Sequence, residues 1–480
     1  MPIKPLRKAV PWAVVDSVST GLLGILTLSI LTRVLNAEEF GAVALVQSIV
    51  ILIQLFTSLG MTEAVIQRRG INDLYINSAF WLSTLMGLLG FLLSLSIAAY
   101  FLLGTSEPLL AALMVVEGVA CLFVGLNLVP AALLERNLDT KAVAKRTFAG
   151  KVTFGIVAIT LAFMHFGVWS IIIAGICQHV ISTIILWTYT QYKPDKKHSL
   201  SHAIELSKYG IPIMLESALW AFLTRVFNLL VGAFHGLEVL GIINIATRTG
   251  EVFANIISSV SNRIGLPLFS SIQDQPKKLK QAFKVATEMA SLVALPIFTG
   301  LMLTSSDWVP LFLGEKWGNL APLINIVCIV WMVSFTRVFA GSYLRAIGQA
   351  KAMLLPAISA AIITIIAVYA TQNLSPIFVM VAWAVRVIAT FPLSIFVLQK
   401  HGRFYWKTQL IPLIKPLIAT ALMAIAVLAI RFQASALQLN GSLNLIASVL
   451  VGAAVYIGIV FIHYRHTVKA WRDASNIAQV

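Results

Sequence analysis

Long apolar runs separated by short polar connections fill almost the whole chain. A helix that crosses the hydrocarbon core of a bilayer needs about 20 predominantly apolar residues, and the runs reach that length repeatedly. The connections between them are too short to hold a soluble catalytic domain. The pattern predicts fourteen membrane-spanning helices, with expected ranges 9–32, 41–62, 78–103, 109–134, 148–165, 168–190, 209–234, 239–268, 284–304, 319–343, 352–370, 376–398, 411–430 and 442–463.

The composition supports the same interpretation. Charged residues make up 11% of the 480 residues and apolar residues 59%. A soluble domain carries roughly 25% charged residues, and its interior is too small to hide this much apolar surface. The expected fold class is therefore an all-α integral membrane protein. The composition excludes a disordered chain, a collagen and a coiled coil.

Lysine and arginine predict which side of the membrane each connection faces. The N-terminus, the C-terminus and the connections after even-numbered helices hold 27 of these residues, whereas the opposite side holds three, Arg33, Lys316 and Arg431. Basic residues concentrate on the cytoplasmic side of membrane proteins. Both termini are therefore expected in the cytoplasm. This topology accounts for the net charge of +16, so we expect no nucleic-acid partner.

The cysteines and histidines give no sign of metal or redox chemistry. Cys121, Cys177 and Cys328 all lie in apolar runs without paired spacing, and the eight histidines are scattered. We expect no metal site, no cofactor and no catalytic residue. The first apolar run follows three basic residues but is too long for a signal-peptide core. We expect it to remain as the first membrane helix.

A short motif recurs 200 residues apart. Residues 35–41 read LNAEEFG and residues 235–241 read HGLEVLG, so that Glu38 matches Glu238 and Gly41 matches Gly241 without a gap. The unit between them contains six helices, an even number. Two such units would be parallel and related by an axis along the membrane normal. Chance similarity between two short turns is the alternative.

The repeat predicts the domain organisation. We expect an N-terminal lobe of six helices at 1–200 and a C-terminal lobe of six helices at 201–400, arranged around a central cleft. Residues 401–480 would form helices thirteen and fourteen and a cytoplasmic tail. A duplicated helical bundle with a central cleft is typical of a transporter.

Several motifs in this order and spacing resemble a known family. They are FG at 40–41, GM at 60–61, AVIQR at 64–68, PLFSSIQD at 267–274, VPLFLGEKW at 309–317 and GQ at 348–349. The pattern is similar to the polysaccharide-transport family of the multidrug/oligosaccharidyl-lipid/polysaccharide exporter superfamily, above all to colanic-acid-exporter-like flippases. The resemblance covers about residues 10–400.

The resemblance implies a function. Members of that family move an undecaprenyl-diphosphate-linked oligosaccharide from the inner to the outer leaflet of the bacterial inner membrane. The implied partners are this lipid-linked substrate, the bilayer lipids, and the polysaccharide polymerase and export machinery. The family has few invariant catalytic residues, so its motifs carry structure more than chemistry.

Charged residues inside the apolar runs are the candidate functional residues. A charge at the bilayer centre is costly, so it should face a cavity or a partner. Counting from the turn at Gly236 at about 1.5 Å per residue, Arg225 and Arg248 lie roughly 17 Å deep, and Arg386 lies equally far from the start of its helix. Arg337 lies deeper toward the cytoplasm.

These four arginines are expected to hold the substrate diphosphate. Arginine presents a planar fork of donors that matches phosphate oxygens and stays charged at any cellular pH. The positions 200 residues before Arg225 and Arg248 are Ile25 and Ser48, so we expect the second lobe alone to form the cationic wall. The alternative is that a neighbouring carboxylate neutralises each arginine.

Three carboxylates are candidates for ion coupling. Glu251 is the one carboxylate predicted near the midplane in the second lobe, although it lies three residues from Arg248 and could simply pair with it on one helix face. Asp16 and Glu216 occupy matching positions in the repeat, near the inner interface. For these two, a solvated edge is the alternative.

Two other functions remain open at this stage. A multidrug cation antiporter of the same superfamily would have the same architecture, but its cavity walls would be acidic. A membrane glycosyltransferase or polymerase would place its catalytic residues in a large outer loop, which this chain does not have. We therefore expect a transporter and not an enzyme.

Overall fold

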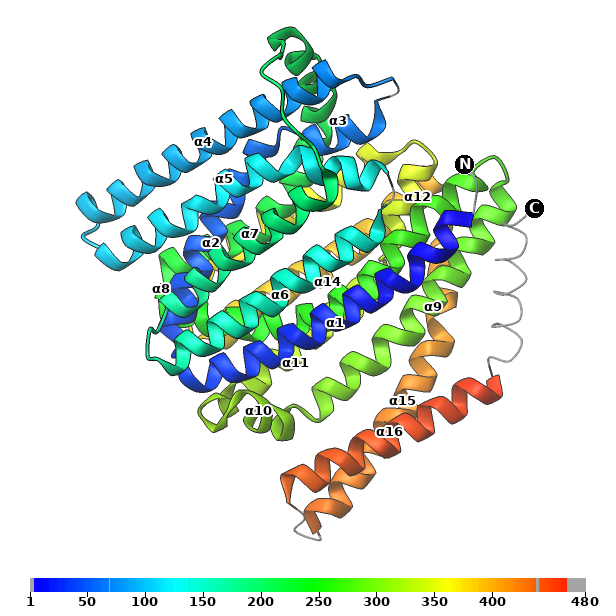
Figure 1. The fold of residues 1–480 in the computed structure, drawn as a ribbon. Helices are drawn as coiled ribbons and strands as arrows, with labels where there is room; N and C mark the ends of the chain where they lie inside the picture. Colours follow the sequence, from blue (N-terminus) through cyan, green and yellow to red (C-terminus); the bar gives the residue numbers. More distant parts are fainter. Residues whose placement is uncertain (1–3, 69, 138, 437–439, 464–480) are drawn as a thin grey trace. The chain divides into compact units, whose positions relative to one another are not determined.

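The computed structural model describes residues 4–68, 70–137, 139–436 and 440–463, without the side chains of residues 4–18 and of scattered positions that lie mostly in α8. Every regular element in these ranges is a helix (Figure 1). The elements are α1 (Lys4–Val34), α2 (Ala37–Ser58), α3 (Met61–Gln67), α4 (Asp73–Leu103), α5 (Pro108–Arg136), α6 (Thr140–Phe163), α7 (Trp169–Thr190), α8 (Leu200–Ser271), α9 (Pro276–Leu303), α10 (Ser305–Leu313), η1 (Glu315–Leu320), α11 (Ala321–Phe335), α12 (Ala340–Ala346), η2 (Ala350–Met353), α13 (Leu354–Ala370), α14 (Pro376–Gly402), α15 (Trp406–Ala436) and α16 (Gly441–His463).

Twelve helices within the described ranges are long and apolar enough to cross a membrane. This number counts α8 once, through its segment 224–258, and leaves out α1, of which residues 19–34 form a shorter apolar helix. α8 has 72 residues and a non-helical backbone at Gly236 (φ 83°, ψ 174°). The turn between the predicted helices 209–234 and 239–268 therefore lies where the sequence places it.

Polar residues at the helix starts explain several boundaries. Asn36 caps α2, because its side chain accepts a hydrogen bond from the amide of Glu39 while the Glu39 carboxylate accepts one from the amide of Asn36. The side chains of Asn72 and Asp139 cap α4 and α6 in the same position. Such caps satisfy amides that have no partner in the first helical turn. α2 begins four residues earlier than predicted as a result.

Two predicted helices, 41–62 and 319–343, each contain a short non-helical break, so their prediction as continuous helices is wrong. Each still lies within one candidate membrane span, Ala37–Ile66 and Glu315–Ala346. Left-handed backbone at Leu59 (φ 46°) and Gly60 (φ 63°) ends α2 and starts α3. Between residues 336 and 339, backbone hydrogen bonds reach back three residues and not four, which separates α11 from α12. The mean hydropathy of a segment does not reveal such breaks, because Leu59 is as apolar as its neighbours and the polar Thr336 and Arg337 lie within a long apolar run.

The chain packs as two compact units, unit 1 (Met1–Asn244) and unit 2 (Ile245–Val480). In unit 1, α4 packs on α5, α6 packs on α7, and α1 packs on α6. In unit 2, α9 packs against α11 and α15, and α15 pairs with α16. The predicted domain boundaries follow the sequence repeat, whereas these two units follow the packing of the helices. The lobes 1–200 and 201–400 and the segment 401–480 therefore stay a prediction.

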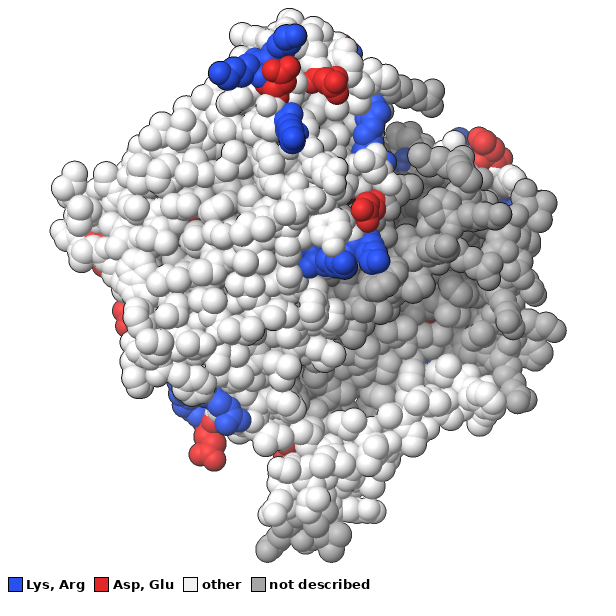
Figure 2. All heavy atoms as spheres, in the orientation of Figure 1, with Lys and Arg blue, Asp and Glu red and all other residues white. Residues whose placement is uncertain are grey.

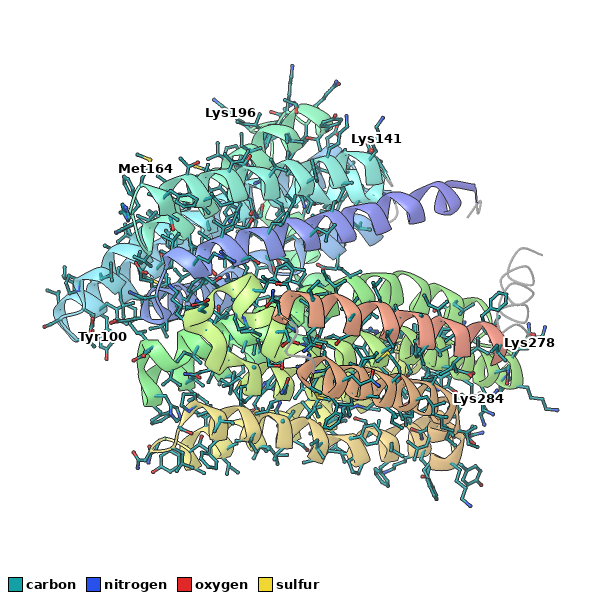
Figure 3. All side chains as sticks on the ribbon, turned by 90° about the horizontal axis from the view of Figure 1, so that it is seen from below. Tyr100, Lys141, Met164, Lys196, Lys278 and Lys284 are labelled. Atoms are coloured by element: carbon teal, nitrogen blue, oxygen red, sulfur yellow. The ribbon has the colours of Figure 1, made fainter. Side chains whose placement is uncertain are left out.

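The described surface has the character of a membrane-exposed protein. Figure 2 shows one face on which charged side chains gather near the helix ends while the surface between them is uncharged. Along α4, Leu85, Leu88, Leu89, Leu92 and Leu93 are each 45–51% exposed. In unit 1, Tyr100 and Met164 lie at one end of the helices, and Lys141 and Lys196 lie toward the other (Figure 3).

Candidate functional site

Arg337 occupies the break between α11 and α12, and its side chain reaches α14. Its Nη1 atom donates to the carbonyl oxygen of Thr390 at 3.1 Å and to Oγ of Ser394 at 2.6 Å. The guanidinium carbon lies 5.3 Å from the centroid of the Phe391 ring. Both acceptors are neutral, and in the described part of the chain no carboxylate forms an ion pair with Arg337. The charge of Arg337 is therefore hydrogen-bonded but not neutralised there.

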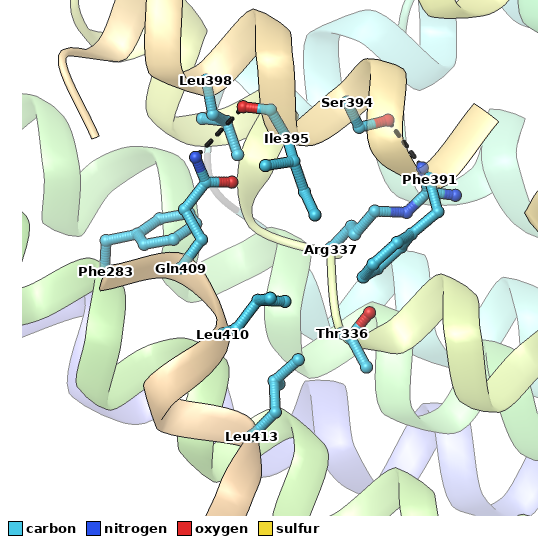
Figure 4. Close-up of a pocket in the computed structure, with 10 residues that line it drawn as sticks. All are labelled: Phe283, Thr336, Arg337, Phe391, Ser394, Ile395, Leu398, Gln409, Leu410 and Leu413. Carbon is cyan, nitrogen blue, oxygen red and sulfur yellow. Dashed lines mark hydrogen bonds between the residues drawn. The ribbon is translucent and has the colours of Figure 1, made fainter. Parts of the chain in front are cut away.

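Arg337 lines a pocket between three helices of unit 2 and the α11–α12 connection (Figure 4). About 320 Å³ of empty space lies in and around the pocket, and this figure includes open solvent. We call it the Arg337 pocket, and it is lined by Phe283 of α9, Thr336 and Arg337 of the α11–α12 connection, Phe391, Ser394, Ile395 and Leu398 of α14, and Gln409, Leu410 and Leu413 of α15. No lining residue is acidic. Positive charge in a largely apolar setting favours an anion as the ligand of such a pocket.

Arg386 lies on the same helix that accepts the hydrogen bonds of Arg337. The Thr390 hydroxyl donates to the carbonyl oxygen of Arg386 at 3.0 Å, and the Thr390 carbonyl accepts from Arg337. The Arg386 guanidinium is 5.4 Å from the centroid of the Trp383 ring, which is a favourable position for a cation. The structure thus brings two of the four predicted arginines within about one helical turn of each other along α14.

Arg225 belongs to unit 1, not to the unit that holds the other three arginines. It is half-buried on α8. One turn further, the buried Asn228 donates to Oγ of Ser48 on α2 at 3.1 Å. This contact makes a polar pair inside the apolar packing of α2 and α8. A single cationic wall formed by all four arginines stays a prediction.

Arg248 and Glu251 lie one turn apart on the second half of α8, and both are half-buried. Asp16 and Glu216 lie on the backbones of α1 and α8, but their side chains fall outside the described residues. The roles predicted for these carboxylates therefore stay predictions. Within the described ranges, no three His, Cys, Asp or Glu side chains form a group that could hold a metal ion.

The repeated glycines lie against each other's helices. A Cβ atom on Gly41 would lie 1.8 Å from the carbonyl oxygen of Leu237, and one on Gly241 would lie 1.7 Å from the carbonyl oxygen of Ala37. These distances leave no room for any side chain. α2 and the second half of α8 therefore touch backbone to backbone where both begin.

A second glycine crossing joins the opposite end of α2 to the first half of α8. A Cβ atom on Gly60 would lie 2.1 Å from the carbonyl oxygen of Gly210, and one on Gly210 would lie 2.5 Å from that of Gly60. The sequence pattern does not predict this contact, because Gly60 and Gly210 do not follow the 200-residue repeat. The GM motif at 60–61 was its one visible signal.

A cluster of polar and charged side chains joins the start of α8 to the end of α3 and the start of α4. Glu205 accepts hydrogen bonds from Arg68 at 2.9 Å and from the Tyr75 hydroxyl at 2.7 Å, and the Arg68 guanidinium lies 3.8 Å above the Tyr75 ring. The hydrogen bond from Tyr75, followed by that from Arg68, lowers the pKa of Glu205 below its ordinary value. The sequence offered no signal for this cluster, since Arg68 and Glu205 are 137 residues apart.

Comparison with known proteins places this architecture among polysaccharide biosynthesis proteins. Residues 30–322 match the family described as "Polysaccharide biosynthesis protein". The chain is 24% identical over 348 residues to the lipopolysaccharide biosynthesis protein WzxC of Escherichia coli (strain K12), covering 70% of this chain and 68% of WzxC. It is 23% identical over 484 residues to the succinoglycan biosynthesis transport protein ExoT of Rhizobium meliloti (strain 1021), covering 98% of this chain and 96% of ExoT.

Solved structures show the same fold. The lipid II flippase MurJ in an inward closed conformation superposes with a TM-score of 0.75 at 16% identity, over 95% of this chain and all of that chain (100%). An inward-facing multidrug resistance MATE family transporter of the MOP superfamily superposes with a TM-score of 0.64 at 16% identity, over 81% of this chain and 99% of that chain. The resemblance seen in the sequence motifs is confirmed. Because the family match spans more than half of its residues, this multi-pass chain belongs to the polysaccharide biosynthesis protein family.

Proposed function

We propose that the chain moves a polyprenyl-diphosphate-linked oligosaccharide from the inner to the outer leaflet of the bacterial inner membrane. The observation that carries this proposal is the match over nearly the whole chain to ExoT, whose name describes a transport protein of polysaccharide biosynthesis. The fold shared with a lipid II flippase supports the same class of lipid-linked substrate. Transport of this kind needs no catalytic residue.

In this proposal the chain crosses the membrane fourteen times, with both termini in the cytoplasm. α8 crosses twice, because a helix of 72 residues is about 108 Å long and turns at Gly236. α1 supplies the remaining crossing. The lobes are residues 1–200 and 201–400, and α15 and α16 follow them. The reciprocal contact of Gly41 and Gly241 supports two lobes related by the repeat.

The diphosphate is held by Arg225, Arg248 and Arg386, with Arg337 in support. The charge of the diphosphate is the main barrier to unassisted flipping. Arginines near the middle of the membrane offer it a polar binding site, which we call the midplane station. Rocking of the two lobes exposes that station to each leaflet in turn, while the lipid tail stays in the bilayer. The shared helix of Arg386 and Arg337 supports their action on one substrate.

Coupling to an ion, where it occurs, involves Glu251, with Glu216 and Asp16 as further candidates. Glu251 lies one turn from Arg248, so protonation of Glu251 would change the charge next to the midplane station. The partners of the transporter are the lipid-linked substrate, the surrounding lipids, and the polymerase and export machinery that use the product.

Antiport of multidrug cations is the second candidate function, favoured by the fold shared with MATE transporters. Cation transport calls for acidic walls, whereas the Arg337 pocket has no acidic lining residue. The two functions predict different phenotypes of a deletion strain. A flippase deletion stalls the lipid-linked oligosaccharide on the inner leaflet and stops polysaccharide export. An antiporter deletion leaves export unchanged and increases sensitivity to cationic drugs, which would contradict our proposal.

A further inference from the structure

The Arg337 pocket lies close to one end of the unit 2 helices. Gln409 is three residues and Leu413 is seven residues into α15 from Trp406, so these walls lie roughly 5–10 Å along the helix from it. Trp406 and the preceding Tyr405 are 50% and 75% exposed. Exposed Trp and Tyr at a helix end mark the membrane–water interface. The pocket therefore lies roughly 5–10 Å along α15 from the expected membrane–water interface.

The helices that form the pocket also face the bilayer. On α15, Ile411 and Ile414 are 56% and 51% exposed, and on α14 Phe396 is 52% exposed. These side chains adjoin the pocket-lining residues in the sequence. An acyl or prenyl chain would thus have an apolar helix surface beside the pocket.

The polar groups of the pocket can bind a phosphate group and also a hydrogen-bond donor that lies next to it in a lipid headgroup. Among the described residues, Nε and Nη2 of Arg337 have no hydrogen-bond partner, so both donors remain for phosphate oxygens. The amide nitrogen of Gln409 donates to the carbonyl oxygens of Ile395 and Phe404. This orients the Gln409 amide and leaves its Oε1 as an acceptor on the pocket side (Figure 4).

We infer that the Arg337 pocket binds the phosphate of a membrane lipid, in a subsite formed with α15 on the cytoplasmic side of the midplane station. The phosphate accepts from Arg337, and a headgroup hydroxyl or ammonium donates to Gln409. Such an anion supplies the counter-charge that the described part of the chain does not give Arg337. The inference rests on the proposed orientation, which places this end of the helices in the cytoplasmic leaflet. Two lipids there carry the required group, an anionic phospholipid and the diphosphate-linked substrate.

Photo-cross-linking from the pocket wall tests this inference without requiring transport. The photoreactive residue p-benzoylphenylalanine replaces Leu413, and the purified full-length protein is placed in phosphatidylcholine vesicles. One set of vesicles contains phosphatidylglycerol and another contains a polyprenyl diphosphate. Mass spectrometry then measures the lipid adduct. An adduct in either set that falls about tenfold in Arg337→Gln supports the inference, since one charge-assisted hydrogen bond is worth roughly that factor.

The two sets of vesicles identify the source of the phosphate. An Arg337-dependent adduct with phosphatidylglycerol indicates a resident phospholipid, and one with the polyprenyl diphosphate alone indicates a substrate subsite. Lys407→Gln removes an exposed positive charge from the same end of α15 and should leave the adduct unchanged. Leu410→Trp fills the pocket while keeping Arg337, and should remove the adduct even if Arg337→Gln fails to fold. Adducts that persist in both pocket variants, or that form in neither lipid, would overturn the inference, whatever the outcome of the transport assays.

Discussion

Gly41 and Gly241 meet in a reciprocal contact. Gly41 touches the backbone of Leu237, and Gly241 touches the backbone of Ala37. Residue 41 lies 200 positions before residue 241, and residue 37 lies 200 positions before residue 237, so the repeat converts one contact into the other. Reciprocity of this kind is the signature of two elements related by a two-fold axis. The weak sequence repeat therefore corresponds to a physical contact between the two glycine-containing segments.

The first prediction concerns the space at this contact. Gly41→Ala should destabilise the protein, because the new methyl group would overlap a carbonyl oxygen and force the helices apart, at a cost of about 1–3 kcal/mol. Gly241→Ala should have a similar effect, since its surroundings are equivalent. Thermal unfolding of the purified variants in detergent measures the loss of stability.

Gly458→Ala in α16 is the matched control. A Cβ atom there would meet nothing within 4 Å, and alanine is favoured over glycine in a helix by about 1 kcal/mol. This variant should be as stable as the wild type or slightly more stable. Equal unfolding temperatures for all three variants would show that the glycine contact does not constrain the packing of α2 and α8.

The second prediction concerns topology. Ser199 lies just before α8, and Gln372 lies between α13 and α14. In the proposed orientation, the first faces the cytoplasm and the second faces the outside. Single cysteines at these positions, in a variant without Cys121, Cys177 and Cys328, should react with a membrane-impermeant reagent from opposite sides. Labelling of both from the same side would rule out the proposed arrangement of the helices between them.

The third prediction concerns ion coupling. If Glu251 couples transport to an ion, Glu251→Gln should abolish the dependence of transport on that ion while substrate binding remains. If Glu251 only pairs with Arg248, the variant should keep the ion dependence and lose stability instead. Transport measured with and without an ion gradient, together with thermal unfolding, separates these outcomes. Ion dependence that is unchanged would remove Glu251 from the coupling mechanism.

The fourth prediction concerns pH and the cluster at the start of α8. The folded state lowers the pKa of Glu205, so this carboxylate stabilises the fold above the pKa of an unfolded glutamate, about 4.3. That stabilisation is lost as the pH falls through the lowered folded pKa. The unfolding temperature of the wild type should therefore fall across this acidic range more steeply than that of Glu205→Gln. Parallel curves for the two proteins would show that the Arg68 and Tyr75 contacts add no stability.

Most of the helical architecture could be predicted from apolar periodicity, because a bilayer imposes one length on every crossing. The turn at Gly236 was also predictable, since a glycine interrupts two apolar runs there. The breaks at Leu59 and at 336–339 were not. They depend on local backbone geometry, which the mean hydropathy of a segment does not record.

The candidate site was predictable only in part. Charge inside an apolar run identifies Arg337 and Arg386 as unusual, because such charges are costly in a membrane. The sequence does not reveal that Arg337 reaches Thr390 and Ser394, or that α15 completes a pocket around it. Those contacts join residues that are more than 50 positions apart, and they depend on how the helices pack in three dimensions.

Flipping of a lipid-linked oligosaccharide by the purified protein tests the central claim most directly. Vesicles containing the protein and a polyprenyl-diphosphate-linked oligosaccharide are treated from outside with an impermeant enzyme that cleaves the sugar. The wild-type protein should make the substrate of both leaflets accessible, and replacing Arg225, Arg248 and Arg386 by glutamine should restrict cleavage to the outer leaflet, as in protein-free vesicles. The exposed Lys407→Gln control should behave as the wild type. If the folded wild-type protein leaves cleavage restricted to the outer leaflet, the flippase function is contradicted. If the arginine variant makes the substrate of both leaflets accessible, the midplane station is contradicted.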